Sequence, residues 1–98
     1  MPKAMLTISY VIKPDSREQY IALSREMKVH FVTTRKKNYG VFESENKKNQ
    51  FTEVLITDTQ EELEMFDEGD EILEGFMGRL TKLVDAKGIK FNTLVESE

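Results

Sequence analysis

The sequence contains no cysteine and no tryptophan, and it has one histidine and two prolines among 98 residues. Without cysteine the protein can form no disulfide bond, no thiolate nucleophile and no cysteine-ligated zinc site. A histidine-based metal site is disfavoured too, because His30 has no second imidazole or thiol to complete its coordination. We therefore expect the protein to bind no metal ion, and the sequence implies no cofactor.

Long apolar segments are also missing. No stretch approaches the roughly 20 apolar residues that a membrane-spanning helix needs, and the first residues lack the basic region, apolar stretch and cleavage site of a signal peptide. The absence of cysteine also suits a reducing compartment. We therefore expect a soluble cytoplasmic protein that enters no membrane, with residues 1–98 forming a single domain.

Charge of both signs is abundant but unevenly distributed. Residues 1–57 hold ten basic and six acidic side chains, whereas residues 58–98 hold four and twelve, and the formal net charge is −4. A net acidic chain is not expected to bind nucleic acid, because such binding needs a basic face that releases counterions from phosphates. Residues 58–78 contain nine acidic residues and no basic one. This segment is either a solvated helix face or an acidic surface for a basic partner, including the basic half of a second subunit.

Hydrophobic periodicity in the first half of the chain predicts a strand followed by a helix. Residues 4–12 alternate with a period of two, which indicates a strand, and Pro14 ends it. The segment Asp15–Glu18 has the form of a capping box and predicts the start of a helix. The β-branched run Val29–Thr34 has low helix propensity, so the sequence leaves the end of this helix open.

The second half predicts a hairpin, a second helix and a last strand. Residues 39–45 and 50–57 are expected to form strands joined by a short polar turn, and Thr59–Glu62 is a second capping box. The apolar stripe of the helix that follows is interrupted beside Gly69, which predicts a kink or a break there. Gly88 is expected to cap this helix before a strand over residues 89–96.

This order of elements is that of an α+β, ferredoxin-like β-α-β-β-α-β fold, with a four-stranded antiparallel sheet and two helices on one face. The other face of the sheet would be half apolar. It would carry Met5, Thr7 and Val11, together with either Val54 and Ile56 or Phe51 and Leu55. Because exposed apolar patches of this kind usually mark interfaces, we expect a homodimer that pairs through the sheets.

The run Phe51–Glu62 (FTEVLITDTQEE), with the length and element order, resembles the dimeric α/β-barrel superfamily, which includes antibiotic-biosynthesis monooxygenase-type domains, haem-degrading monooxygenases and muconolactone isomerase. The resemblance implies a dimeric α/β barrel with a small aromatic or polyketide-like ligand. If catalytic, the protein would perform cofactor-independent oxygenation or proton-transfer isomerisation. Haem degradation is disfavoured, because those members use a Trp and a His on the second helix. This chain has no Trp, and His30 lies in the first helix, so no catalytic residue can be transferred by position.

Two side chains are candidates for acid–base catalysis. His30 is the one side chain whose unperturbed pKa lies near neutrality; it is either a general base at the mouth of a pocket or a packing histidine. Glu53 lies in an otherwise apolar strand. It would be a buried carboxylate with a raised pKa if it faces the helices, an ion-pair partner if it faces a second subunit, or a solvated residue at the rim.

Four further side chains are candidates for ligand binding. Tyr10 and Tyr39 are expected to border a pocket between the helices and the sheet, with His30 and Glu53. Arg25 is a candidate anchor for an anionic ligand or a solvated helix arginine, and Asp70 either serves the site or reports the helix break. The alternative function is a non-enzymatic dimeric binding module that uses its acidic second helix as the contact surface.

Overall fold

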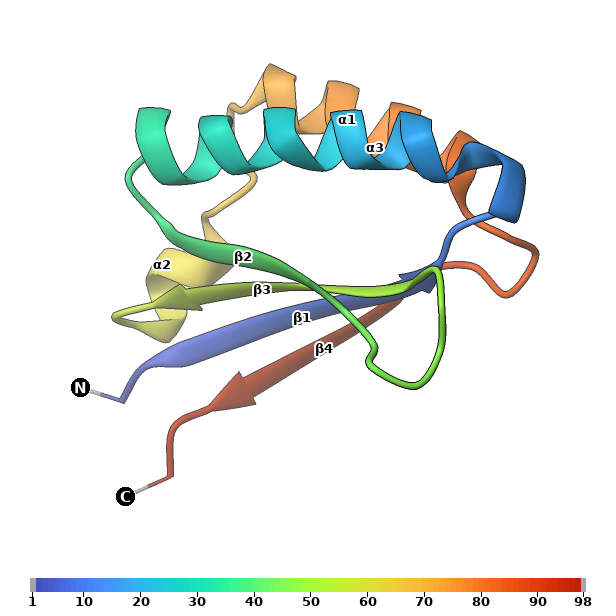
Figure 1. Ribbon diagram of the computed structural model, residues 1–98. Coiled ribbons are helices and arrows are strands. Elements are labelled where there is room, and N and C mark those ends of the chain that lie inside the picture. The colour runs from blue at the N-terminus through green and yellow to red at the C-terminus, as the bar shows by residue number, and fades with distance from the viewer. Residues whose placement is uncertain (1, 98) are drawn as a thin grey trace.

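The computed structural model of the chain, which describes residues 2–97, contains a four-stranded antiparallel sheet in the order β2-β3-β1-β4. The strands are β1 (Ala4–Val11), β2 (Asn38–Glu43), β3 (Gln50–Thr57) and β4 (Lys90–Val95). The helices are α1 (Arg17–Lys28), α2 (Gln60–Glu64) and α3 (Glu71–Leu83). Helices α1 and α3 pack together over one face of the sheet, and no helix covers the other face (Figure 1). The expected ferredoxin-like α+β fold is confirmed.

The strand register determines which side chains face the helices. Ile8 of β1 lies opposite Glu53 of β3 on one side and opposite Phe91 of β4 on the other. Because side chains alternate along a strand, these three residues point to the helix side. Glu53 therefore adopts the helix-facing orientation, one of the three that its sequence context allowed.

The opposite face, called the open face below, carries the alternate residues of all four strands. The pairing of β1 with β3 places Val54 and Ile56 on this face, whereas Phe51 and Leu55 face the helices. Thr and Ser side chains interrupt the apolar ones, and Ser9 Oγ lies 3.0 Å from Thr52 Oγ1. The open-face residues are Met5, Thr7, Ser9, Val11, Asn38, Gly40, Phe42, Gln50, Thr52, Val54, Ile56, Lys90, Asn92 and Leu94.

The core lies between α1, α3 and the three strands β1, β2 and β3. Strand β4 contributes no buried residue, because no helix lies over it and all six of its residues are exposed. On β4, Phe91 is 59% exposed although it points to the helix side. The buried apolar cluster consists of Tyr10, Ile12, Tyr20, Leu23, Met27, Phe31, Tyr39, Phe51, Leu55, Phe76, Leu80 and Val84.

The start of α1 differs from the sequence expectation. The capping box predicted at Asp15–Glu18 does not form, since Pro14–Ser16 is a 3₁₀ turn and no side chain caps the helix that follows. Proline fixes its own φ at a helical value and so starts the turn early. Asp15 thus lies inside the turn rather than ahead of the helix.

The end of α1 lies within the β-branched run that the sequence left open. The helix continues from Lys28 into a π-helical segment, Val29–Thr34. The wider turn is closed by a hydrogen bond of 2.9 Å from the Arg35 amide to the carbonyl of His30, five residues earlier. Crowding of β-branched side chains against the preceding turn gives a physical reason for widening the helix here.

The second predicted helix is divided where its apolar stripe was interrupted. Gly69 has φ of 70°, in the left-handed region that favours glycine, and α3 begins two residues later. The break predicted near Gly69 is confirmed. Thr59 caps α2 by accepting the Glu62 amide at 3.1 Å, as its capping box predicted.

Gly88 does not cap α3, which corrects the sequence expectation. The helix ends at Leu83 because Val84 turns to an extended conformation, with ψ of 143°, and forms a β-bridge with Ile12. Gly88 instead takes a positive φ of 80° in the turn that leads to β4. Pairing with the sheet thus ends the helix five residues before the glycine.

Three hydrogen bonds to Glu43, at the β2–β3 hairpin, lead to one testable expectation. Arg17 donates two hydrogen bonds to Glu43, at 2.6 and 2.9 Å, and the Asn49 amide donates a third at 2.9 Å. The Arg17 bonds, followed by that of Asn49, lower the pKa of Glu43 to about 2. A lowered folded-state pKa stabilises the fold above the unfolded-state pKa near 4.5, and this stabilisation is lost as pH falls toward 2.

We therefore expect Glu43→Gln to be less stable than the wild type at pH 6, with the difference shrinking as pH falls through that window. Urea unfolding at four pH values between 2 and 6 measures it. A difference in unfolding free energy that stays constant over this range would contradict the assignment of the shift to Glu43.

Candidate functional site

Glu53 lies at the centre of a buried group of tyrosines. Its side chain comes from β3, only 4% of the residue is exposed, and it accepts hydrogen bonds from Tyr39 at 2.7 Å and from Tyr10 at 2.8 Å. The hydroxyl oxygens of Tyr10 and Tyr20 lie 2.7 Å apart. The Tyr10 hydroxyl donates its one hydrogen bond to Glu53. The hydrogen bond between the two hydroxyls must therefore be donated by Tyr20. Tyrosine side chains from β1, α1 and β2 thus form a connected set of hydrogen bonds around the carboxylate of β3.

Burial dominates the electrostatics of this group. It raises the pKa of Glu53, and the hydrogen bonds from Tyr39 and Tyr10 only partly oppose that shift. Burial also raises the pKa of Tyr10, Tyr20 and Tyr39 far above the ordinary value of 10. The phenols therefore remain protonated donors. Together they form a site that can hold and release a proton away from bulk water.

A second group forms around Asp70, which precedes α3. Its Oδ1 accepts the Leu73 amide at 3.0 Å and so caps the helix, while its Oδ2 lies 2.8 Å from His30 Nε2 and 2.9 Å from Arg35 Nη1. Burial alone would raise the pKa of Asp70, but the hydrogen bonds from His30 and the Leu73 amide outweigh it and lower that pKa. Asp70 is therefore an ionised carboxylate that holds the imidazole in place.

These two groups are distinct, although the sequence analysis expected His30 to share a pocket with Glu53. The ring of Phe31 lies against both groups, with its centroid 5.0 Å from that of His30 and 4.8 Å from that of Tyr39. The structure thus brings Tyr10, Tyr39 and Glu53 into contact and places His30 with Asp70. The expected set divides because Phe31 is buried in the core, whereas the His30 side chain, which is 11% exposed, bonds to Asp70.

Arg25 lies outside both groups. It is exposed on α1 and lines a surface groove of about 440 Å³ between α1 and α3, together with His30. Arg79 of α3 forms an ion pair with Glu26. Of the six candidates named from sequence, three therefore meet at the buried carboxylate and three lie at or next to this groove.

Two members of these groups were not identified as functional from the sequence. In the sequence, Tyr20 falls on the apolar side of the first helix, and Arg35 begins the basic run Arg35–Lys37 that follows it. A signal was available for Tyr20, because a buried tyrosine hydroxyl requires a hydrogen-bond partner. No such signal marked Arg35, whose guanidinium donates to Asp70 and to the Phe66 carbonyl and lies 4.4 Å from the Phe66 ring centroid.

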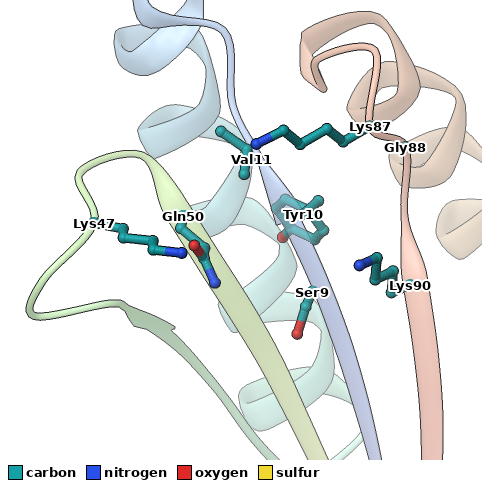
Figure 2. A pocket seen from close by; sticks show the side chains of 8 residues that line it. All are labelled: Ser9, Tyr10, Val11, Lys47, Gln50, Lys87, Gly88 and Lys90. Carbon is teal, nitrogen blue, oxygen red and sulfur yellow. The ribbon is translucent and has the colours of Figure 1, made fainter.

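A hollow at one end of the open face is lined by basic side chains. It has a volume of about 210 Å³, and Lys47, Lys87 and Lys90 reach it from three separate segments (Figure 2). No carboxylate lines it. Neither this hollow nor the other three described on residues 2–97 is lined by Glu53. The buried carboxylate is therefore covered by the side chains packed around it.

Neither a metal centre nor a membrane segment is found in the part of the chain that the structure describes. No three His, Cys, Asp or Glu side chains of that part are grouped so that they could hold a metal ion. None of its helices is long and apolar enough to cross a bilayer.

Several solved structures share this fold at low sequence identity. A conserved protein from Methanosarcina mazei matches with a TM-score of 0.87 and 13% identity over 99% of this chain and 95% of that one. SnoaB, a cofactor-independent oxygenase from Streptomyces nogalater, matches with 0.78 and 5% identity over 98% and 94%. A candidate antibiotic biosynthesis monooxygenase from Nitrosomonas europaea matches with 0.77 and 13% identity over 94% and 88%. No protein-family model and no curated protein matches the chain significantly. The chain thus shares the ferredoxin-like fold of these structures.

Proposed function

We propose that the protein binds a small phenolic or enolisable aromatic compound and removes a proton from it with Glu53, as a cofactor-independent oxygenase or isomerase would. One observation carries the proposal: a buried carboxylate with a raised pKa accepts hydrogen bonds from two protonated tyrosines, Tyr10 and Tyr39. A desolvated carboxylate is a stronger base than one in water. The fold shared with SnoaB, itself a cofactor-independent oxygenase, supports this choice of chemistry.

The chemistry follows from the proton relay. Proton transfer from the substrate to Glu53 leaves a phenolate or enolate and a neutral carboxyl group. Tyr10 or Tyr39, whose hydroxyl groups lie 2.8 and 2.7 Å from that carboxyl, can then donate to the substrate oxygen that has gained charge. In an isomerisation Glu53 returns the proton to another carbon. In an oxygenation the electron-rich anion itself reduces O₂.

A substrate would reach Glu53 from the side of β4. Ile8 separates Glu53 from Phe91 in the strand order, so Phe91 lies about 10 Å from Glu53, two strand spacings away. Ile8 is half-buried and Phe91 is exposed on the same helix-facing side. The side chains between the carboxylate and this edge of the sheet are apolar, which suits an aromatic ligand.

Glu53→Gln tests the proposal. We expect this variant to lower the turnover of an anthrone or a dihydroxynaphthalene by about 100-fold or more, because general-base catalysis contributes at least that much. Oxygen uptake measures oxygenation, and exchange of substrate hydrogen for deuterium measures proton removal without it. Glu43→Gln, which changes a carboxylate outside the tyrosine group, is the matched control. Equal exchange rates in Glu53→Gln and the wild type would refute the assignment.

We propose further that the protein is a homodimer whose two sheets pack through their open faces. This face carries Phe42, which is 61% exposed, and Leu94, which is 47% exposed, beside half-buried Met5, Val54 and Ile56. An exposed apolar face of this extent usually marks an interface. The basic hollow at one end of the face offers complementary charge to the acidic segment of a second copy.

The alternative function is a non-enzymatic binding module that uses the acidic segment at residues 58–78 as its contact surface. It is favoured by the packing around Glu53, since among residues 2–97 no buried side-chain nitrogen or oxygen atom lacks a hydrogen-bond partner. A fully satisfied carboxylate can serve structure alone. The deuterium-exchange assay separates the two functions, because a binding module exchanges no substrate hydrogen.

A further inference from the structure

The pair formed by His30 and Asp70 has the geometry of a base held by a carboxylate. Asp70 Oδ2 lies 2.8 Å from His30 Nε2, and the pKa of Asp70 is lowered, so the carboxylate is ionised and Nε2 is the donor. In the neutral imidazole the proton is then on Nε2 and the lone pair is on Nδ1. Asp70 thus selects one tautomer and leaves Nδ1 as the acceptor.

Nδ1 of His30 is not completely buried. It has no hydrogen-bond partner among residues 2–97, where His30 bonds through Nε2. In that same part of the chain, no side-chain nitrogen or oxygen atom is both buried and without a partner. Nδ1 therefore keeps some accessible surface, although only 11% of the His30 side chain is exposed. His30 is one of the residues that line the groove between α1 and α3.

The groove combines apolar walls with one unpaired cation and with the carboxylate of Glu26, whose charge is paired with that of Arg79. Val29 and Ile72, which are 58% and 56% exposed, line it together with Phe76. Arg25 also lines it and has no ion-pair partner within residues 2–97. Apolar walls beside a free guanidinium suit a molecule with an aromatic body and a carboxylate, because arginine binds carboxylates through two parallel hydrogen bonds.

The spacing of the polar groups sets the size of the ligand. Arg25 and His30 are five residues apart on one continuous helical run, which corresponds to a rise of about 7.5 Å. This rise separates the two backbone positions along the helix axis, and a naphthalene ring system with polar groups at opposite ends has a comparable length. The π-helical segment that contains His30 is a local distortion of a kind frequently found at functional sites.

We propose that this groove is a binding site for small hydroxylated aromatic carboxylates. Arg25 holds the carboxylate, Val29 and Ile72 contact the ring, and Nδ1 of His30 accepts a hydrogen bond from the ligand hydroxyl. Asp70 acts as a positioning residue that fixes the imidazole. This site is separate from Glu53 and does not depend on the proton transfer proposed there.

The test uses the full-length protein and a hydroxynaphthoate whose hydroxyl and carboxylate lie at opposite ends of the ring system. Because the chain has one histidine, diethyl pyrocarbonate modification reports His30 alone among imidazoles. We expect the wild type to be modified at His30 and the hydroxynaphthoate to protect it in a saturable manner. The neutral methyl ester of the same compound should bind about tenfold more weakly, as expected for the loss of one charged hydrogen-bond pair.

Two variants locate the site. Arg25→Gln should weaken hydroxynaphthoate binding about tenfold, while Lys28→Gln, which removes an exposed cation of α1 that does not line the groove, should leave it within about twofold. Asp70→Asn keeps a helix-capping side chain but should slow the modification of His30 several-fold. Absence of protection, equal affinity for the ester, or an equal effect of Arg25→Gln and Lys28→Gln would each overturn the proposal.

Discussion

Replacing Tyr10 and Tyr39 together with phenylalanine should lower the free energy of unfolding by about 3 kcal/mol or more at pH 8 and by much less at pH 4. Each tyrosine donates a hydrogen bond to a buried carboxylate, and bonds to charged groups contribute about 1.5–3 kcal/mol each. Without them Glu53 would be ionised in an apolar site, or it would have to take up a proton to fold.

The pH dependence follows from the raised pKa of Glu53. A carboxyl group whose folded-state pKa exceeds the unfolded value near 4.5 binds more protons in the folded state, so stability falls as pH rises through the interval between the two values. Removing the two phenols raises the folded-state pKa further and extends that interval upward. The difference between the double variant and the wild type should therefore grow with pH.

Tyr20→Phe is the matched control for this experiment. Its hydroxyl donates to Tyr10 rather than to the carboxylate, so its loss should cost only about 1 kcal/mol, with little change between the two pH values. Urea unfolding at pH 4 and pH 8 measures all three proteins. If the double variant lost the same unfolding free energy at both values, Glu53 would not be the charge that the phenols stabilise.

The second large effect is expected on association. Phe42→Asp should convert the proposed dimer into a monomer at micromolar concentration. In a two-fold interface the substitution occurs twice, and two buried unpaired charges at about 2 kcal/mol each raise the dissociation constant about a thousandfold. The Phe42 ring lies over Gly40 on the open face, where a Cβ on the glycine would come within 3.2 Å of it. Native mass spectrometry and sedimentation velocity measure the change.

Met65→Asp provides the comparison for Phe42→Asp. Met65 is 60% exposed, nearly as much as Phe42, but it lies at the end of α2 and not on the open face. The same charge introduced at an equally exposed apolar residue should leave the dimer intact. A wild type that is monomeric at all concentrations, or equal dissociation by the two variants, would rule out pairing through the open face.

Much of the fold could be predicted because local patterns and tertiary structure agree. Residues 50–57 were predicted to form a strand and form β3 over those same residues, although the side to which Glu53 points was settled only by the register. Gly69 interrupts a helical stripe and takes a left-handed conformation in the turn between α2 and α3. The capping box predicted at Asp15–Glu18 was wrong because Pro14 starts a 3₁₀ turn there. The helix cap predicted at Gly88 was wrong because Val84 pairs with Ile12 and ends the helix before the glycine.

The candidate site was harder to predict, because its grouping depends on register and on helix rotation. Tyr10, Tyr39 and Glu53 lie on three different strands, and only the pairing of β1, β2 and β3 brings their side chains together. His30 and Phe31 are adjacent in sequence, yet one contacts Asp70 and the other is buried in the core. Which of the two would face inward depended on the π-helical turn, and the sequence showed only a weakened helix there.

The position of β4 also determines the order in which the sheet can form. Its ladder with β1 ends in a hydrogen bond of 2.8 Å from the Glu96 amide to the Lys3 carbonyl, and these residues are 93 positions apart. Contacts this distant in sequence are costly to close and form late in folding. During synthesis β1 therefore pairs with β3 while its other edge is still free. A ribosome that stalls before Lys90 would release a chain with a permanently unpaired central strand, and such an edge can pair with another chain.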